Sequence, residues 1–456
     1  MAVVRVPHGE HHDLSRSAER GPARGPSWPG VVAHGVVLAL LLAGCTTSER
    51  SNAAGRDTPS STVGDSSTGA AESSASSAPH SSSVPTINSN KGDRALIDAA
   101  WANDLEQARQ LIAAGADVNA QDASRQSAYL IATSEGHLEL LELFLANGAD
   151  VAALDSYRGT GLIRAAERGH ADIVGRLLRS GIDVNHVNNL GWTALHEAVI
   201  LGNGSERYVD TVRLLVAGGA NVGLAAAEDG IAALEHAEAR QQQRVAATLR
   251  AAVAAPALPT PADAARQLLD AAAAGDADRA ALGLRAGAGI ETRDGNQRSA
   301  LLLAAAADHV ETARLLVRLG ADPDALDEAH DTPWLVTGVT GSVAMAELLL
   351  GAGADLTITN RFGGLSIIPA SERGHVGYVR RVATSGINVN HVNNLGWTAL
   401  LEAVILGDGS EPYQQIVQIL IDAGADRTIA DVDGTSALDH ARRRNHDAVA
   451  AILSRP

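Results

Sequence analysis

The sequence contains a single cysteine, a single lysine and few aromatic residues. Cys45 is the only thiol among the 456 residues, which excludes a disulfide between two of them. Phe, Trp and Tyr together make up 3% of the residues, too few to favour an aromatic-lined cofactor pocket. Lys91 is the only lysine, so nearly all the positive charges are arginines, scattered between acids. These deficits favour a fold stabilised by many small aliphatic contacts.

The charge balance of the whole chain is acidic. The formal net charge is −17. Residues 1–44 carry four Arg and three acids, a balance of +1, so the remainder of the chain carries −18. Nucleic acid is a poor partner for such a surface, because a polyanion binds mainly by pairing its phosphates with Lys and Arg.

The N-terminal region predicts a lipid anchor. An apolar run from Val36 to Ala43 follows four Arg and ends in Leu42-Ala43-Gly44-Cys45, which resembles the lipobox of bacterial lipoproteins. The run is too short to span a bilayer. We therefore expect residues 1–44 to be a lipoprotein signal peptide and the Cys45 thiol to receive a diacylglyceryl group. This predicts a membrane-anchored protein of the bacterial cell envelope, facing the periplasm or the cell exterior; an ordinary thiol is the alternative.

Residues 45–93 differ in composition from the rest of the chain. They are mostly Ser, Thr, Ala, Gly and Pro, with almost no large apolar side chain. Such a segment buries too little surface to offset the entropy lost on ordering. We expect a disordered tether between the anchor and a folded part that begins near Arg94.

One stretch of the chain occurs twice. Residues 186–208 read HVNNLGWTALHEAVILGNGSERY, and residues 391–413 read HVNNLGWTALLEAVILGDGSEPY. Within and around each copy, a polar turn followed by two short apolar helical stretches recurs at intervals near 33 residues. Ser127 and Thr160 are placed to cap such helices, and Gly115 to end one. A period of this length is typical of a solenoid built from stacked units.

The repeated phrase resembles the ankyrin repeat. The phrase contains Gly-x-Thr-x-Leu-x-x-Ala (with His196 in the first copy), and other units of the chain contain Gly-His, Leu-Leu and Gly-Ala-Asp-x-Asn at the family's spacing. The resemblance implies an all-α ankyrin-repeat solenoid, with helix-turn-helix units joined by β-hairpin-like loops. The boundaries predict two tandem arrays from an internal duplication: about five repeats over 94–252, a Pro-containing linker or hinge over 253–262, and about six repeats over 263–456.

The resemblance also implies non-catalytic binding of a partner protein through a concave groove of hairpin tips and first helices. Large aromatic side chains on that surface are candidate hot spots, although each ring is equally compatible with packing on a neighbouring unit. Two longer interhelical segments, near residues 202–206 and 407–411, are further candidates. The candidate partner-binding residues are Tyr157, Trp192, Asn203, Glu206, Phe362, Trp397, Asp408 and Glu411.

No catalytic, cofactor or metal-binding residues are predicted. Of the 16 His, His137, His170 and His375 follow Gly at the ankyrin helix turn and His196 occupies the Thr-x-Leu-His position, and no pair of His has metal-ligand spacing with a third ligand beside it. No nucleophile elbow is present, and the Asp408–Glu411 loop lacks the alternating carboxylates of a calcium site. Two alternative functions stay open: a structural envelope protein that self-associates, and a metal-binding or hydrolytic protein that uses the inserted loops.

Overall fold

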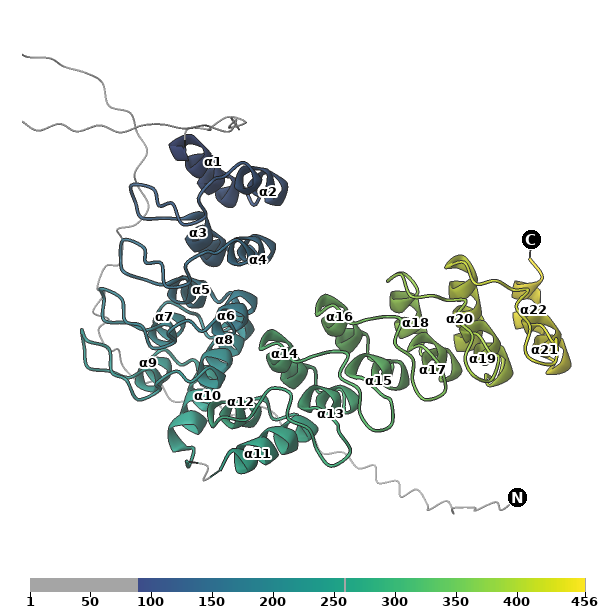
Figure 1. Ribbon diagram of the computed structural model, residues 1–456. Helices are drawn as coiled ribbons and strands as arrows, with labels where there is room; N and C mark the ends of the chain where they lie inside the picture. Colours follow the sequence, from purple (N-terminus) through teal and green to yellow (C-terminus); the bar gives the residue numbers. More distant parts are fainter. Residues whose placement is uncertain (1–88, 258–259, 456) are drawn as a thin grey trace, which may run out of the picture. The chain divides into compact units, whose positions relative to one another are not determined.

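A computed structural model describes residues 89–257 and 260–455, and these are organised as antiparallel helix pairs (Figure 1). The described residues contain helices but no strands, as expected for an ankyrin-repeat solenoid. The first helices of successive pairs pack on one another in one row, and the second helices pack in another row. Five pairs lie before Pro256 and six after residue 259.

Most of the first, or inner, helices are short, because only about two turns separate the capping residue from the interhelical turn; α1 and α11, which begin the two arrays, are longer, with 13 and 14 residues. The inner helices are α1 (Ser89–Trp101), α3 (Ala128–Glu135), α5 (Gly161–Arg168), α7 (Ala194–Ile200), α9 (Ala233–Ala239), α11 (Pro261–Ala274), α13 (Ala300–Ala306), α15 (Pro333–Thr340), α17 (Ile367–Glu372), α19 (Ala399–Ile405) and α21 (Ala437–Arg443).

The second, or outer, helices follow after short turns. They are α2 (Leu105–Ala113), α4 (Leu138–Ala146), α6 (Ala171–Leu178), α8 (Glu206–Ala217), α10 (Gln243–Ala254), α12 (Ala277–Arg285), α14 (Val310–Arg318), α16 (Val343–Gly351), α18 (Val376–Val382), α20 (Glu411–Asp422) and α22 (Asp447–Leu453).

Side-chain caps and glycines set the ends of the helices. The hydroxyl of Ser127 accepts a hydrogen bond from the Leu130 N–H at 3.2 Å, and that of Thr160 accepts one from the Ile163 N–H at 3.4 Å. Gly169 ends α5 with φ +69°, a left-handed conformation that favours glycine. The next residue, His170, donates through Nε2 to the Ser134 carbonyl of the preceding unit at 3.0 Å. These residue types therefore both end helices and join units.

The core is continuous along the described repeats and is made mainly of Ala, Leu, Ile and Val. Alanine at buried positions lets helices approach closely, which is why short helices can stack in two rows. A few large side chains fill the wider gaps, and Tyr129, Phe144, Trp334 and Tyr378 are fully buried. Each unit buries its apolar faces against its neighbours and needs no central core.

The two arrays contact each other through their outer helices. Helices α6 and α8 of the first array pack against α14, and α8 also packs against α12. Arg318 lies at this contact, with its Nε 2.7 Å from Asp172 and its Nη1 2.5 Å from Asp210. Gly175 on α6 lies so close that a Cβ there would be 2.6 Å from the Arg318 carbonyl oxygen. The two arrays are thus held together by these side-chain contacts as well as by the connecting segment that was expected to be a linker or hinge.

Several expectations from the sequence concern residues outside the described ranges. The lipobox, Cys45 and most of the predicted tether lie there. Helix α1 begins at Ser89, ahead of the expected start of the array near Arg94. Within the described residues, no helix is both long enough and apolar enough to cross a membrane.

The longer fourth unit has the expected longer segment between its helices and also a longer outer helix. The turn between α7 and α8 spans Leu201–Ser205, five residues against the two between α3 and α4 or between α5 and α6, and α8 is longer than α4 or α6. Glu206 and Glu411 are therefore the first residues of outer helices and are not loop residues. Tyr208, in the first turn of α8, packs back on the preceding unit, where its hydroxyl donates to the Glu167 carbonyl at 3.0 Å.

Candidate functional site: a groove in the second array

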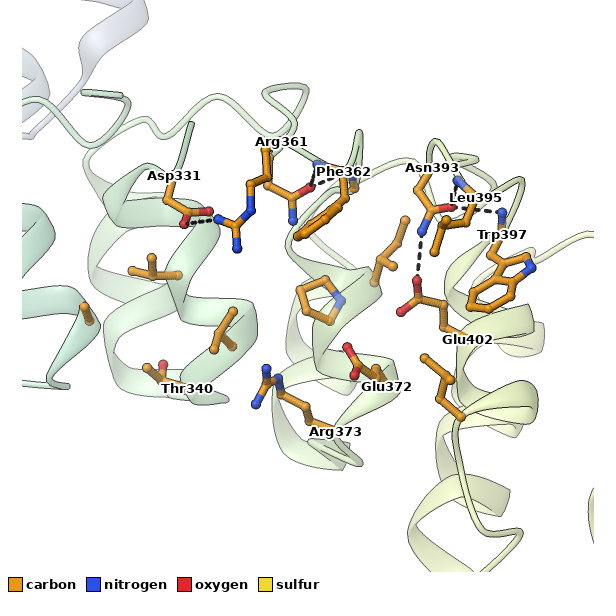
Figure 2. Close-up of a pocket in the computed structure, with 18 residues that line it drawn as sticks. Asp331, Thr340, Arg361, Phe362, Glu372, Arg373, Asn393, Leu395, Trp397 and Glu402 are labelled. Atoms are coloured by element: carbon orange, nitrogen blue, oxygen red, sulfur yellow. Dashed lines mark hydrogen bonds and ion pairs between the residues drawn. The ribbon is translucent and has the colours of Figure 1, made fainter. Parts of the chain in front are cut away.

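A hollow of about 490 Å³ lies on the inner-helix side of the second array (Figure 2). Its walls come from inner helices α15, α17 and α19 and from the hairpin turns that precede α17 and α19. Several exposed or half-buried apolar side chains line it, among them Phe362, Leu395, Trp397 and Leu406. Leu395 is 52% exposed and Phe362 is 54% exposed, so this part of the groove presents apolar surface to solvent.

Asn393 shapes the hairpin turn beside the hollow. Its Oδ1 accepts hydrogen bonds from the backbone N–H groups of Leu395 and Trp397, both at 3.0 Å. Its amide then donates to Oε1 of Glu402 at 2.8 Å. Asn393 and Glu402 are both buried, with 7% and 6% of their surface exposed. An asparagine serves both purposes because its oxygen forms the turn while its nitrogen supports a carboxylate.

The Glu402 carboxyl is held in an unfavourable environment. Burial, together with the nearby Glu372 carboxylate, raises its pKa to about 7, while the Asn393 hydrogen bond acts in the opposite direction. Figure 2 shows both carboxyl groups in the gap between α17 and α19. Among the described residues, the Glu372 side chain has no hydrogen-bond or ion-pair partner within bonding distance. The floor of the hollow therefore holds two acids and no cation paired with either of them.

The other charged side chains lie around the rim. Arg361 is 3.5 Å from Asp331, and its guanidinium lies 4.6 Å from the centre of the Phe362 ring. Arg373 follows Glu372 at the end of α17 and is exposed. Arg361 is thus already paired with an acid and an aromatic ring, whereas Arg373 extends toward solvent.

The corresponding place in the first array is filled by an arginine. By register, Arg164 corresponds to Pro369, Asp155 to Asn360, and Glu167 to Glu372. Arg164 is 2.6 Å from Glu167 and 3.5 Å from Asp155. The second copy therefore differs from the first at a position that lines the hollow. Pro369 is too short to contact an acid, so the space that Arg164 fills in the first copy stays open.

Helix α17 tolerates this proline because of its position. Pro369 lies in the first turn, where a backbone N–H has no intrahelical partner to lose. In the first copy, the Arg164 N–H donates to the Thr160 carbonyl at 3.1 Å. In the second copy Leu365 replaces that threonine, and α17 has no side-chain cap. The replacement of Thr160 and Arg164 by Leu365 and Pro369 thus accounts both for the open hollow and for the shorter helix α17.

The structure brings together two of the predicted partner-binding residues. Phe362 and Trp397 both line the hollow, on successive hairpins. Tyr157 corresponds to Phe362 in the first array and is 49% exposed. Trp192 is half-buried, and its indole N–H is buried with no hydrogen-bond partner among the described residues. The tryptophans therefore combine packing with partial exposure.

Of the four candidates near these turns, Asn203 and Asp408 lie between inner and outer helices, and Glu206 and Glu411 begin the outer helices α8 and α20. Asn203 and Asp408 are exposed and accept the backbone N–H groups of Ser205 and Ser410, at 3.0 and 2.9 Å. Glu206 pairs with Arg244 on α10, and Glu411 accepts a hydrogen bond from the Gln415 side chain at 3.1 Å. Their observed contacts stabilise turns and neighbouring helices. None of the four lines the hollow.

Sequence reasoning missed Glu372, Asn393 and Glu402. Two signals in the sequence point to them. One is the glutamate within the apolar stretch Ala399–Ile405, at a position that faces the preceding unit. The other is the change from Arg164 to Pro369 between two otherwise similar copies. Within the described residues there is no group of three or more side chains arranged to hold a metal ion.

Models of ankyrin repeats match most of the described chain. The model of three ankyrin repeat copies matches residues 128–226, 268–360 and 340–431, and a single-repeat model matches residues 91–123. These matches cover well over half of the sequence, so the chain belongs to the ankyrin repeat family. Ankyrin repeat proteins are typically non-catalytic scaffolds that bind other proteins.

Individual ankyrin repeat proteins are similar to parts of this chain. The putative ankyrin repeat protein YahD of Escherichia coli K12 is 42% identical over 99 residues, which are 22% of this chain and 49% of that protein. The chain therefore spans about half the length of this relative. An ankyrin repeat domain of Acinetobacter baumannii AYE is 46% identical, with 41% of this chain and 95% of that one covered and a TM-score of 0.40. The ankyrin repeat protein EF0377 is 32% identical, with 41% and 96% covered and a TM-score of 0.40.

Proposed function

We propose that this protein is a non-catalytic scaffold that binds a partner protein through the inner-helix groove of its ankyrin arrays. The observation that carries the proposal is the hollow in the second array, where Phe362, Leu395 and Trp397 form an apolar surface beside buried polar groups. A small number of placed polar groups within an apolar surface is typical of binding sites. Family membership supports the same class of function.

The first test replaces the two equivalent tryptophans with alanine, Trp192→Ala and Trp397→Ala, in one chain. Aromatic side chains at a binding surface often contribute 2 kcal/mol or more, so we expect partner capture from bacterial envelope extracts to fall at least about tenfold. Arg380→Ala on outer helix α18 serves as the control and should have no effect. Unchanged capture by the double variant, with helicity retained in circular dichroism, would remove the tryptophans from the site.

We also propose that the scaffold is held on the outward face of a bacterial membrane by lipid on Cys45. The support is the sequence Leu42-Ala43-Gly44-Cys45 after a short apolar run. Two or more acyl chains suffice for stable anchoring, whereas one is marginal. The Ser- and Thr-rich residues between Cys45 and the start of α1 would hold the repeats away from the headgroups.

The anchor is tested by metabolic labelling with a fatty acid in a bacterial host. We expect the full chain to incorporate label and to fractionate with membranes, and we expect Cys45→Ser to do neither. A chain that fractionates with membranes equally well after this substitution would contradict lipid anchoring through Cys45. The repeats, which are distant in sequence, should retain the same helicity in both proteins.

A further inference from the structure

The two copies of the duplicated segment reveal which chemical group fits the hollow. In the first copy, the guanidinium of Arg164 occupies the equivalent place, 2.6 Å from Glu167 and 3.5 Å from Asp155. Burial raises the pKa of Glu197, which corresponds to Glu402, to about 7, and the nearby Arg164 acts in the opposite direction. The chain therefore contains an internal example of a cation in contact with these acids.

In the second copy the two glutamates are retained, Asn360 replaces Asp155, and the arginine is absent. Glu372 and Glu402 correspond to Glu167 and Glu197, whereas Pro369 replaces the arginine. Glu402 is 6% exposed, and only its Oε1 accepts a hydrogen bond from within the described residues, from Asn393. A buried carboxylate without a counterion is costly, and a cation placed beside it removes part of that cost. The hollow is thus complementary to a positive group supplied from outside.

The remaining lining defines the shape of that group. Phe362, Leu395 and Trp397 surround the approach to the two carboxyl groups. Lysine and arginine side chains bury their methylene stems along apolar surface while their charged ends contact acids or aromatic faces. A small hydrated cation would gain nothing from these apolar walls. The two arginines of the lining, Arg361 and Arg373, lie at the rim of the hollow.

We propose that the second-array hollow binds an arginine or lysine side chain of a partner protein, with Glu372 and Glu402 as its acidic partners and with its stem against Phe362 and Trp397. The inference rests on the proposed function and specifies the chemistry of the partner. The first array binds no such side chain at the equivalent place, because Arg164 occupies it. The net charge of −17 also favours a basic partner segment, because opposite charges attract.

The test uses the full chain and a phage-displayed library of random 12-residue peptides. We expect selection to enrich peptides with a central Arg or Lys flanked by apolar residues. A synthetic enriched peptide should bind at least about tenfold more weakly after Glu402→Gln, and equally weakly when its arginine is replaced by citrulline. A charge-assisted hydrogen bond in a desolvated site is worth about 1.5 to 3 kcal/mol, which corresponds to this change in affinity.

Two further variants give independent controls. The double variant Asn360→Asp with Pro369→Arg recreates the Asp155–Arg164 pair in the second copy and should abolish peptide binding while leaving the fold intact. Glu197→Gln makes the same change in the first copy and should leave peptide affinity unchanged. Circular dichroism of each variant identifies any loss of folding.

The outcomes separate this inference from the proposed function. Enriched peptides that lack basic residues, and that lose binding after Phe362→Ala but keep it after Glu402→Gln, would overturn the cation site and leave the groove as a binding surface. Enriched peptides unaffected by Phe362→Ala, Trp397→Ala and the double variant would overturn the groove as well. Binding of a second copy of this chain in preference to any peptide would overturn the assignment to a partner protein.

Discussion

Replacing Glu402 with glutamine is expected to stabilise the protein at pH 8 by about 3 kcal/mol. Burial and the adjacent Glu372 raise the folded-state pKa of Glu402 to about 7, from an ordinary value of 4.5. Wild-type protein must therefore ionise a buried carboxyl at pH 8, whereas glutamine keeps the hydrogen bond with Asn393 and carries no charge. A substitution at a candidate binding residue would thus improve folding, as expected where a site is built at a cost to stability.

The pH dependence of this effect has a definite sign. Because the folded-state pKa is raised, the folded chain binds the proton more tightly than the unfolded chain between pH 4.5 and 7. The contribution to stability is fully present below pH 4.5 and is lost as the pH rises through 7. The gain from Glu402→Gln should therefore be close to zero at pH 4.5 and reach its full size by pH 8.

Urea unfolding of both proteins at pH 4.5, 6 and 8 measures this difference. Glu328→Gln is the matched control, because Glu328 is exposed and its carboxylate makes no hydrogen bond or ion pair with another described residue. The control should change the free energy of unfolding by less than about 0.5 kcal/mol at each pH. A Glu402→Gln variant less stable than wild type at pH 8, or equally altered at all three pH values, would show that the carboxyl is not held at a raised pKa.

Replacing Arg318 with alanine is expected to destabilise the chain by about 3 kcal/mol and to separate the unfolding of the two arrays. Arg318 is mostly buried and reaches Asp172 and Asp210 on outer helices of the first array. Its removal leaves Asp210, which is 8% exposed, with Arg213 at 3.5 Å as its remaining partner. Removing one partner of a buried ion pair costs more than the pair contributes, because the other charge stays buried.

Scanning calorimetry distinguishes this result from a general loss of stability. The variant should show two resolved transitions where the wild type shows more strongly coupled unfolding. The control is Arg381→Ala, which removes an ion pair at 3.1 Å with Glu347 on exposed helix surface and should cost less than about 1 kcal/mol. Equal losses in the two variants, or a single transition in both, would contradict a stabilising contact between the arrays.

Much of the fold could be predicted from the sequence because the relevant information is local. Ser127 and Thr160 cap helices, and Gly169 ends one, through contacts within a few residues. Repetition of these signals near every 33 residues then determines the stacking. The longer fourth unit was less predictable, because a helix extension and a longer loop add the same number of residues.

The candidate site was only partly predictable, for a physical reason. Phe362 and Trp397 stand out in a sequence with few aromatics, and both line the hollow. Glu402 does not stand out, because its burial depends on how α17 and α19 pack. The contacts of Arg318 with Asp172 and Asp210 join residues 146 and 108 positions apart, and neither pair belongs to the repeat pattern.

Site-specific photo-crosslinking in cells tests the groove most directly. A photoreactive phenylalanine analogue at position 395 lies at the edge of the hollow, and the same residue at position 380 lies on outer helix α18. We expect a discrete protein adduct from position 395 that disappears with Asn360→Asp plus Pro369→Arg, and no adduct from position 380. Adducts from position 380 alone, or equal adducts from both positions unaffected by that double variant, would contradict partner binding in the second-array groove.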